Sequence, residues 1–133
     1  MNRVLLILVA ALLSGSLLAQ ESPTTPRAGR IRITQGPTIE LATEYLTIIR
    51  WTTNNPGGYP VHYGIVRYGV SPSRLTETAK SPIRLNPDHS STVFRVRLDN
   101  LKARTTYYFV VDSMGANGEP DGVTSSIGQF RTR

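Results

Sequence analysis

Hydrophobic and polar positions alternate along this chain in short runs that are separated by turn-forming residues. In residues 94–98 and again in 106–111, apolar or aromatic side chains recur at every second position, and a short polar corner lies between the two runs. A period of two is typical of a strand with one buried face, because successive side chains point to opposite sides of a sheet. Beyond the N-terminal apolar run, no stretch combines helical periodicity with a helix cap. The pattern predicts an all-β domain.

Seven strands are expected, each bounded by Gly, Pro, Asn or Asp. They span residues 31–39, 45–53, 61–69, 75–80, 92–98, 106–113 and 123–132. With Trp51 and Tyr107 facing inward, the alternation assigns every other inward position. The predicted inward set is Ile31, Ile33, Thr47, Ile49, Trp51, Val66, Tyr68, Phe94, Val96, Leu98, Tyr107, Phe109, Val111 and Phe130. Such a set can form the core of one antiparallel sandwich of two sheets.

The first 19 residues have the layout of a secretory signal peptide. Arg3 is followed by an apolar run from Val4 to Leu13, and small and apolar residues lead to Ala19. The run is too short for a bilayer-spanning helix, so a retained membrane anchor is the less favoured alternative. Residues 20–29 contain prolines and threonines without apolar periodicity and are expected to form a disordered linker. The expected folded domain is 30–133, secreted or periplasmic, with no membrane span after cleavage.

Composition limits how this domain is stabilised and what it binds. The chain has no cysteine, so it has neither disulfides nor a lipid-modified cysteine, and its core alone must hold it together. The length after cleavage suits one sandwich of about 100 residues. A formal charge of +6, of which Arg3 contributes one, favours anionic partners mildly. This bias does not indicate nucleic-acid binding.

Five short segments, taken in order, carry a resemblance to a known family. They are Gln35-Gly36-Pro37, Ile49-Arg50-Trp51-Thr52-Thr53, Arg67-Tyr68-Gly69, the run from Leu101 through Thr105 to Tyr107, and Phe130-Arg131-Thr132. Their order and spacing resemble fibronectin type III/immunoglobulin-like sandwiches, and most closely the N-terminal domain of purple acid phosphatases. The resemblance implies a two-sheet antiparallel sandwich of about seven strands. It also implies that the Tyr107 hydroxyl is hydrogen-bonded to backbone just upstream.

Three positions depart from the family pattern. Ala103 stands where the corner usually carries proline, and Arg104 stands where glycine is common, so we expect a less rigid corner. Phe94 stands where phosphatase-type domains often have histidine. The family's core is kept while local chemistry at its edge is changed.

The resemblance does not imply phosphatase activity. Purple acid phosphatases carry their dinuclear metal centre in a separate catalytic domain, and this sequence lacks the Gly-Asp and Gly-Asn-His signatures of such sites. With two histidines and no cysteine, one chain cannot assemble a catalytic site of several histidines. We therefore expect no enzyme, no catalytic residues, no cofactor and no metal.

The loops of one pole are a weaker possibility for a site. A stacking platform for a sugar ring would use Tyr59, His62 and Tyr63. A Ca²⁺ site would use Asp88, His89, Glu119 and Asp121, although no calcium-binding spacing is met. Ordinary turn chemistry explains the same residues and is the favoured interpretation. By itself, His62 is expected to be a solvent-facing or strand-end residue.

The two outer faces of the sandwich differ in their predicted character. One face carries a basic stripe of Arg32, Arg50, Arg95 and Arg97. Such a stripe either binds an anionic polymer or keeps the sheet soluble, and the second interpretation is favoured. The other face is expected to carry a contiguous apolar patch of Ile65, Tyr108, Val110 and Ile127. An exposed apolar patch is the best indication of a partner in the sequence, although high strand propensity alone also explains such residues.

The favoured function is an exported, non-catalytic binding or adaptor module that docks on a protein or a cell-envelope polymer. One alternative is a detached accessory domain of a separately encoded metallophosphatase or other hydrolase. Another is direct carbohydrate or polyanion binding. The oligomeric state is open, because exposed edge strands are able to pair.

Overall fold

The computed structural model describes residues 26–133, so the predicted signal peptide and residues 20–25 lie outside the described part. The described chain is all-β, as predicted. Its strands are β1 (Ile33–Ala42), β2 (Thr47–Asn54), β3 (Val61–Gly69), β4 (Glu77–Arg84), β5 (Ser91–Leu98), β6 (Thr106–Gly115), β7 (Pro120–Thr124) and β8 (Gly128–Arg131). Between residues 26 and 133 there is no helix capable of crossing a membrane.

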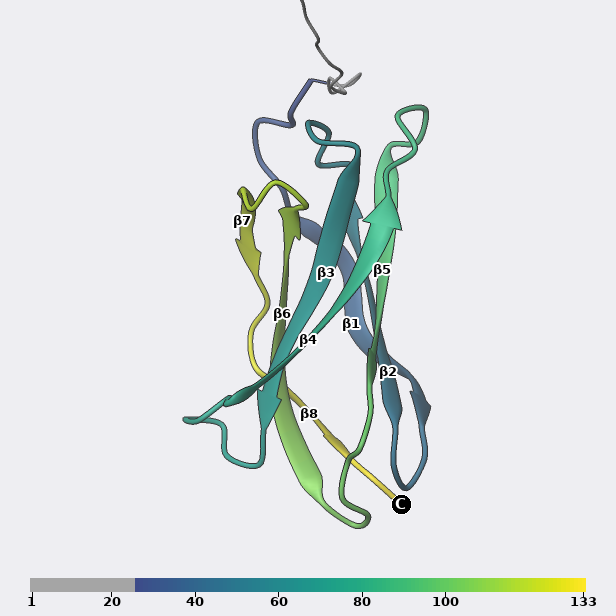
Figure 1. The fold of residues 1–133 in the computed structure, drawn as a ribbon, viewed down its shortest axis with the longest axis vertical. Coiled ribbons are helices and arrows are strands. Elements are labelled where there is room, and N and C mark those ends of the chain that lie inside the picture. Colours follow the sequence, from purple (N-terminus) through teal and green to yellow (C-terminus); the bar gives the residue numbers. More distant parts are fainter. Residues whose placement is uncertain (1–25) are drawn as a thin grey trace, which may run out of the picture.

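The strands form two antiparallel sheets that face each other (Figure 1). One sheet has the order β1-β2-β5, and the other has the order β4-β3-β6 with both β7 and β8 paired to β6. Trp51 of β2 pairs with Phe94 of β5, while Tyr107 of β6 pairs with Phe130 of β8. The predicted sandwich architecture is confirmed.

The observed strands differ most from the predicted ones at the last predicted strand. Residues 123–132 were expected to be continuous, but they divide between β7 and β8 around residues 125–127. At the break the Ser125 side chain accepts a hydrogen bond from the Val111 amide at 2.9 Å, and the Ser125 amide donates to the Val111 carbonyl at 3.0 Å. A side chain thus takes one place in the ladder, as in a β-bulge. Strand β4 also runs past Lys80 through Pro82, which an edge strand tolerates.

The core lies between the sheets and follows the predicted alternation. Twelve of the predicted inward residues are buried, and Ile33 and Tyr68 pack against them half-buried. Trp51 stacks on Phe94 with ring centroids 5.3 Å apart. Gly64 of β3 lies beneath this pair, where an added Cβ would come within 3.1 Å of either ring. A glycine is needed there because the two rings occupy the space of a side chain.

The corner between β5 and β6 has the predicted tyrosine bond. The Lys102 amide donates to the Tyr107 hydroxyl at 2.8 Å. Arg104 has a φ of 53°, the left-handed conformation that glycine adopts most easily. Thr132, the residue directly after β8, holds the corner, since its hydroxyl donates to the Lys102 carbonyl and accepts from the Thr105 amide. The corner without its usual proline is therefore held by the C-terminal segment.

Candidate functional site

His62 lies at the start of β3, as the strand-end alternative has it, but it is buried and does not face solvent. Its side chain is fully enclosed, with Nδ1 3.0 Å from Asp121 Oδ2 and Nε2 3.2 Å from the Gly57 carbonyl oxygen. The Ser113 hydroxyl donates to the same Asp121 oxygen at 2.6 Å. Strand β3 places alternate residues inward, and His62 shares the face of Val66 and Tyr68. We call His62, Asp121 and Ser113 the buried polar cluster.

The hydrogen-bond partners of His62 and Asp121 define the chemistry of the buried polar cluster. Both ring nitrogens of His62 face acceptors, because a carbonyl only accepts and an ionised carboxylate only accepts. A ring that donated from both nitrogens would satisfy both of these acceptors, whereas Asp121 Oδ1 has no hydrogen-bond partner within the described residues. Ser113 bonds to Asp121 and not to His62, so the three residues do not form a nucleophile with its base. The cluster joins the 55–60 loop to β3, β6 and β7.

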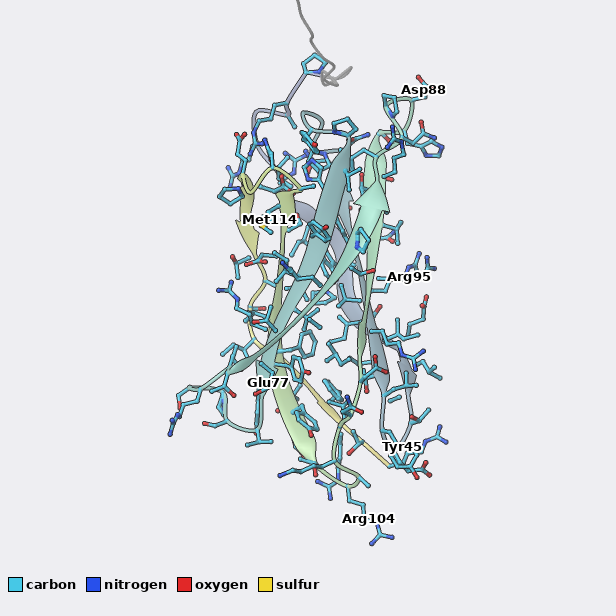
Figure 2. The ribbon with its side chains drawn as sticks, in the orientation of Figure 1. Tyr45, Glu77, Asp88, Arg95, Arg104 and Met114 are labelled. Carbon is cyan, nitrogen blue, oxygen red and sulfur yellow. The ribbon has the colours of Figure 1, made fainter. Side chains whose placement is uncertain are left out.

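The other residues of the predicted loop-pole site are not brought together. Tyr63 points to the opposite side of β3 from His62, and Lys80 Nζ lies 5.3 Å from the centre of its ring. Tyr59 is exposed on the loop before β3. Of the four residues considered for Ca²⁺, Asp121 is held in the buried polar cluster, whereas Asp88 projects outward from the loop between β4 and β5, across the same end of the molecule from β7 (Figure 2). Within residues 26–133 no three His, Cys, Asp or Glu side chains gather as metal ligands.

The outer face of β3, β6 and β8 carries the predicted partner residues. Ile65, Tyr108 and Val110 are half-buried, and Ile127, in the break between β7 and β8, is exposed. Ile65 pairs with Asp112, and Arg67 pairs with Val110. The apolar and charged residues therefore form a checkerboard, and the Arg67–Asp112 ion pair spans one of its diagonals. Burial raises the pKa of Asp112 above its ordinary value, while the Arg67 guanidinium opposes the rise.

The outer face of β1, β2 and β5 carries the predicted arginines, which are partly neutralised. Arg50 pairs with Arg95 across β2 and β5. Arg95 Nε lies 2.9 Å from Glu40 Oε1, and Arg97 Nε lies 2.6 Å from Asp99 Oδ1. Arg32 precedes β1, where its amide donates to the Asn54 side chain. Two of the four arginines thus have carboxylate partners on or beside the same face.

A cleft that the sequence did not indicate lies beside the corner. It has a volume of about 400 Å³, and Tyr68, Glu77, Asp99 and Lys102 are among its lining residues. Burial raises the pKa of the Tyr68 hydroxyl above its ordinary value, and the Glu77 carboxylate adds to the rise. The cleft depends on how the 70–76 loop meets the corner, for which no sequence pattern exists.

The sheet order and the tyrosine corner define this chain as a fibronectin type III-like sandwich domain. Residues 37–132 match the family described as the N-terminal domain of purple acid phosphatase, and the chain belongs to that family. The resemblance found in the sequence is thereby confirmed. None of the curated proteins compared with the chain matches it.

Several solved structures are similar to this chain at low sequence identity. The sensor domain of the anti-sigma factor RsgI4 in Pseudobacteroides cellulosolvens is 17% identical, with 77% of this chain and 87% of that chain covered and a TM-score of 0.47. The fn3 domain of human contactin 1 is 17% identical, with 94% and 87% covered and a TM-score of 0.46. The fibronectin type III domain of human fibronectin type III domain containing protein 3 is 16% identical, with 88% and 92% covered and a TM-score of 0.44.

Proposed function

We propose that this chain is an exported, non-catalytic binding module that docks on a partner protein through the outer face of β3, β6 and β8. The family to which it belongs is described as the N-terminal domain of purple acid phosphatase, which supports a module that accompanies or binds other domains. The layout of residues 1–19 supports export. The alternative of a detached accessory domain of a hydrolase uses the same face and differs in the identity of the partner.

The composition of the outer face carries the proposal. Tyr63, Ile65 and Val110 lie half-buried on it, together with Tyr108 and Met114. Tyrosine, methionine and arginine are enriched in protein interfaces relative to the rest of the surface. The Arg67–Asp112 ion pair lies among these apolar groups. A protein partner could therefore make apolar contacts and also hydrogen bonds that fix its orientation on the face. Sheet β4-β3-β6 has no further layer on this side among residues 26–133 (Figure 1).

The experiment is affinity capture from a cell-envelope extract of the source organism. The bait is residues 20–133, which contain every strand and the whole described core. We expect the wild-type bait to retain one defined protein that the Tyr108→Asp variant loses. A matched variant on the opposite face, Arg95→Asp, should retain it. Thermal unfolding of all three baits must show the same cooperative transition.

Each result separates the alternatives. Retention of the same protein by Tyr108→Asp would show that this face does not dock. Loss on Arg95→Asp, with retention of a glycan and steep weakening by salt, would favour polyanion binding through the arginine face. A captured hydrolase would identify the accessory-domain alternative.

A further inference from the structure

Three segments are joined by backbone hydrogen bonds at the end of the sandwich that is lowest in Figure 1. The Leu101 amide donates to the Tyr45 carbonyl at 2.9 Å, and the Arg104 amide donates to the Arg133 carbonyl at 3.1 Å. The Arg133 amide donates to the Thr43 carbonyl at 3.4 Å. The 70–76 loop adjoins them, because Val70 and Lys102 line the same cleft. We call residues 43–46, 70–76, 99–105 and 131–133 the basic tip.

The basic tip exposes large apolar side chains to solvent. Tyr45 is 65% exposed and Val70 is 61% exposed, while Leu41, 45% exposed, lies just behind the tip on β1. These are three of the five large hydrophobic side chains that are exposed within residues 26–133. Val70 lies on the side of this end opposite to the β1–β2 turn that carries Tyr45, so the three side chains are spread across the end of the molecule (Figure 1). The backbone of Tyr45 is tied to the corner by the Leu101 amide, so the turn that carries its exposed ring is held at this end of the sandwich.

Positive charge gathers on the same segments. They contain the cations Arg74, Lys102, Arg104, Arg131 and Arg133, and the carboxylates Glu44 and Asp99. Asp99 is already paired with Arg97. Within the described residues, Lys102, Arg104 and Arg133 form no ion pair, in contrast to Arg95 and Arg97 on the arginine face. Arg104 and Tyr45 both project from this end of the molecule (Figure 2).

We propose that the basic tip binds the surface of an anionic lipid bilayer. Tyr45, Val70 and Leu41 lie at the level of the headgroups, and Lys102, Arg104 and Arg133 contact lipid phosphates. Tyrosine favours the membrane interface because its ring is apolar and its hydroxyl is hydrated, and lysine and arginine are attracted by the negative surface potential. Apolar contact and charge attraction together give peripheral binding without a membrane-spanning segment.

The shape and chemistry of the tip favour a bilayer over the other anionic partners. A hydrated anionic polymer would contact the cations and leave Val70 and Leu41 in water. An acidic protein would need a surface complementary to three separate turns, whereas a fluid lipid surface adapts to them. The site is separate from the outer face of β3, β6 and β8, which would remain accessible beside the membrane. The proposal therefore goes beyond the proposed function and is tested independently.

The test is cosedimentation of residues 20–133 with vesicles of phosphatidylcholine alone and of phosphatidylcholine mixed equally with phosphatidylglycerol. Residues 1–19 are left out because their apolar run would bind vesicles by itself. We expect binding to the mixed vesicles only. The double variant Lys102→Glu, Arg104→Glu should lower the affinity by about tenfold or more. Tyr45→Ser should lower it severalfold, while the matched double variant Arg32→Glu, Arg95→Glu, which leaves the Arg97–Asp99 pair intact, should bind like wild type.

Several results would overturn the proposal. Absence of binding to mixed vesicles, or equal binding to phosphatidylcholine alone, would remove it. Equal loss in both double variants would mean that only net charge matters. Unchanged binding by Tyr45→Ser, together with binding of soluble dextran sulfate by the tip, would replace the bilayer with an anionic polymer. Trp51 emission verifies that each variant is folded before it is used. Loss of vesicle binding without loss of the captured protein would leave the docking face unaffected.

Discussion

Replacing His62 by leucine would remove the ring that faces the buried Asp121 carboxyl group at 3.0 Å. Asp121 would then keep only the Ser113 hydroxyl as a hydrogen-bond donor, in a site where both side chains of the original pair are fully enclosed. Removal of one member of a buried ion pair costs about 3 to 5 kcal/mol, because the other charge is left buried without compensation. We expect His62→Leu to lower the free energy of unfolding by that amount.

The effect of Asp121→Asn on the free energy of unfolding should have opposite signs in the wild-type chain and in the His62→Leu variant. In the wild-type chain, Asp121→Asn removes a charge that His62 compensates, and it should cost about 1 to 2 kcal/mol. In the His62→Leu background it removes an uncompensated buried charge, so it should increase stability by about 1 to 3 kcal/mol. The double variant should therefore be more stable than His62→Leu alone, which is a coupling that additive effects cannot produce.

Urea denaturation followed by Trp51 fluorescence measures both effects. Trp51 is the only tryptophan of the chain and is 1% exposed, so its emission shifts when the core opens. A domain of this size has a free energy of unfolding of about 5 to 15 kcal/mol. The His62→Leu variant will therefore either show a measurable urea transition at lower urea concentration or be largely unfolded before urea is added. In the second case, recovery of a cooperative transition in the double variant gives the same information.

Two outcomes would refute the reasoning. If Asp121→Asn destabilises both backgrounds equally, the carboxylate is not ionised opposite a cationic ring. If His62→Leu costs less than about 1 kcal/mol, the cluster is no more than ordinary packing. A control at Ser113, Ser113→Ala, should cost about 1 kcal/mol in the wild-type chain and more in His62→Leu, where it is the last donor.

Three further predictions concern the corner and the neighbouring cleft. Tyr107→Phe should lower the free energy of unfolding by about 1 to 2 kcal/mol in urea, because the Lys102 amide loses its partner; an unchanged midpoint would show that water replaces the hydroxyl without cost. Arg104→Gly should raise stability by about 0.5 to 1 kcal/mol because of the positive φ, whereas Ala103→Gly should not, and equal effects would contradict the conformational argument. The raised pKa of Tyr68 means that the folded state holds the Tyr68 proton more tightly than the unfolded chain, so stability should fall as pH rises through 10 and above. Tyr68→Phe should lose less stability than wild type between pH values of about 9 and about 11, and parallel losses would show that Tyr68 does not contribute.

The alternation of apolar positions was sufficient to predict the core, but only within unbroken strands. Applied to β3, the same rule that places Val66 and Tyr68 inward places His62 inward as well. The turn-rich loop before β3 instead suggests a surface position for the histidine. Its burial was therefore predictable, because strand parity outweighs polarity when a partner is present.

The partner itself was not predictable. With Phe130 inward, a continuous last strand would direct Asp121 outward. The break at residues 125–127 shifts the alternation by one position and turns Asp121 toward His62. The checkerboard of Ile65, Asp112 and their neighbours likewise depends on the register of β3 against β6, which one sequence does not define. Local pattern predicts faces, whereas pairing decides which residues meet.

The interrupted last strand also has a consequence for aggregation. Strands β7 and β8 are five and four residues long, and the break between them leaves no long template for another chain to extend. The other edges are interrupted in their own ways, by Pro37 and its register shifts in β1, by Pro82 in β4, and by Arg95 and Arg97 in β5. This domain has no disulfide to limit its opening, and its interrupted edges therefore oppose amyloid-like growth. If residues 125–127 were replaced so that β7 and β8 became one regular strand, the purified protein would be expected to precipitate on concentration.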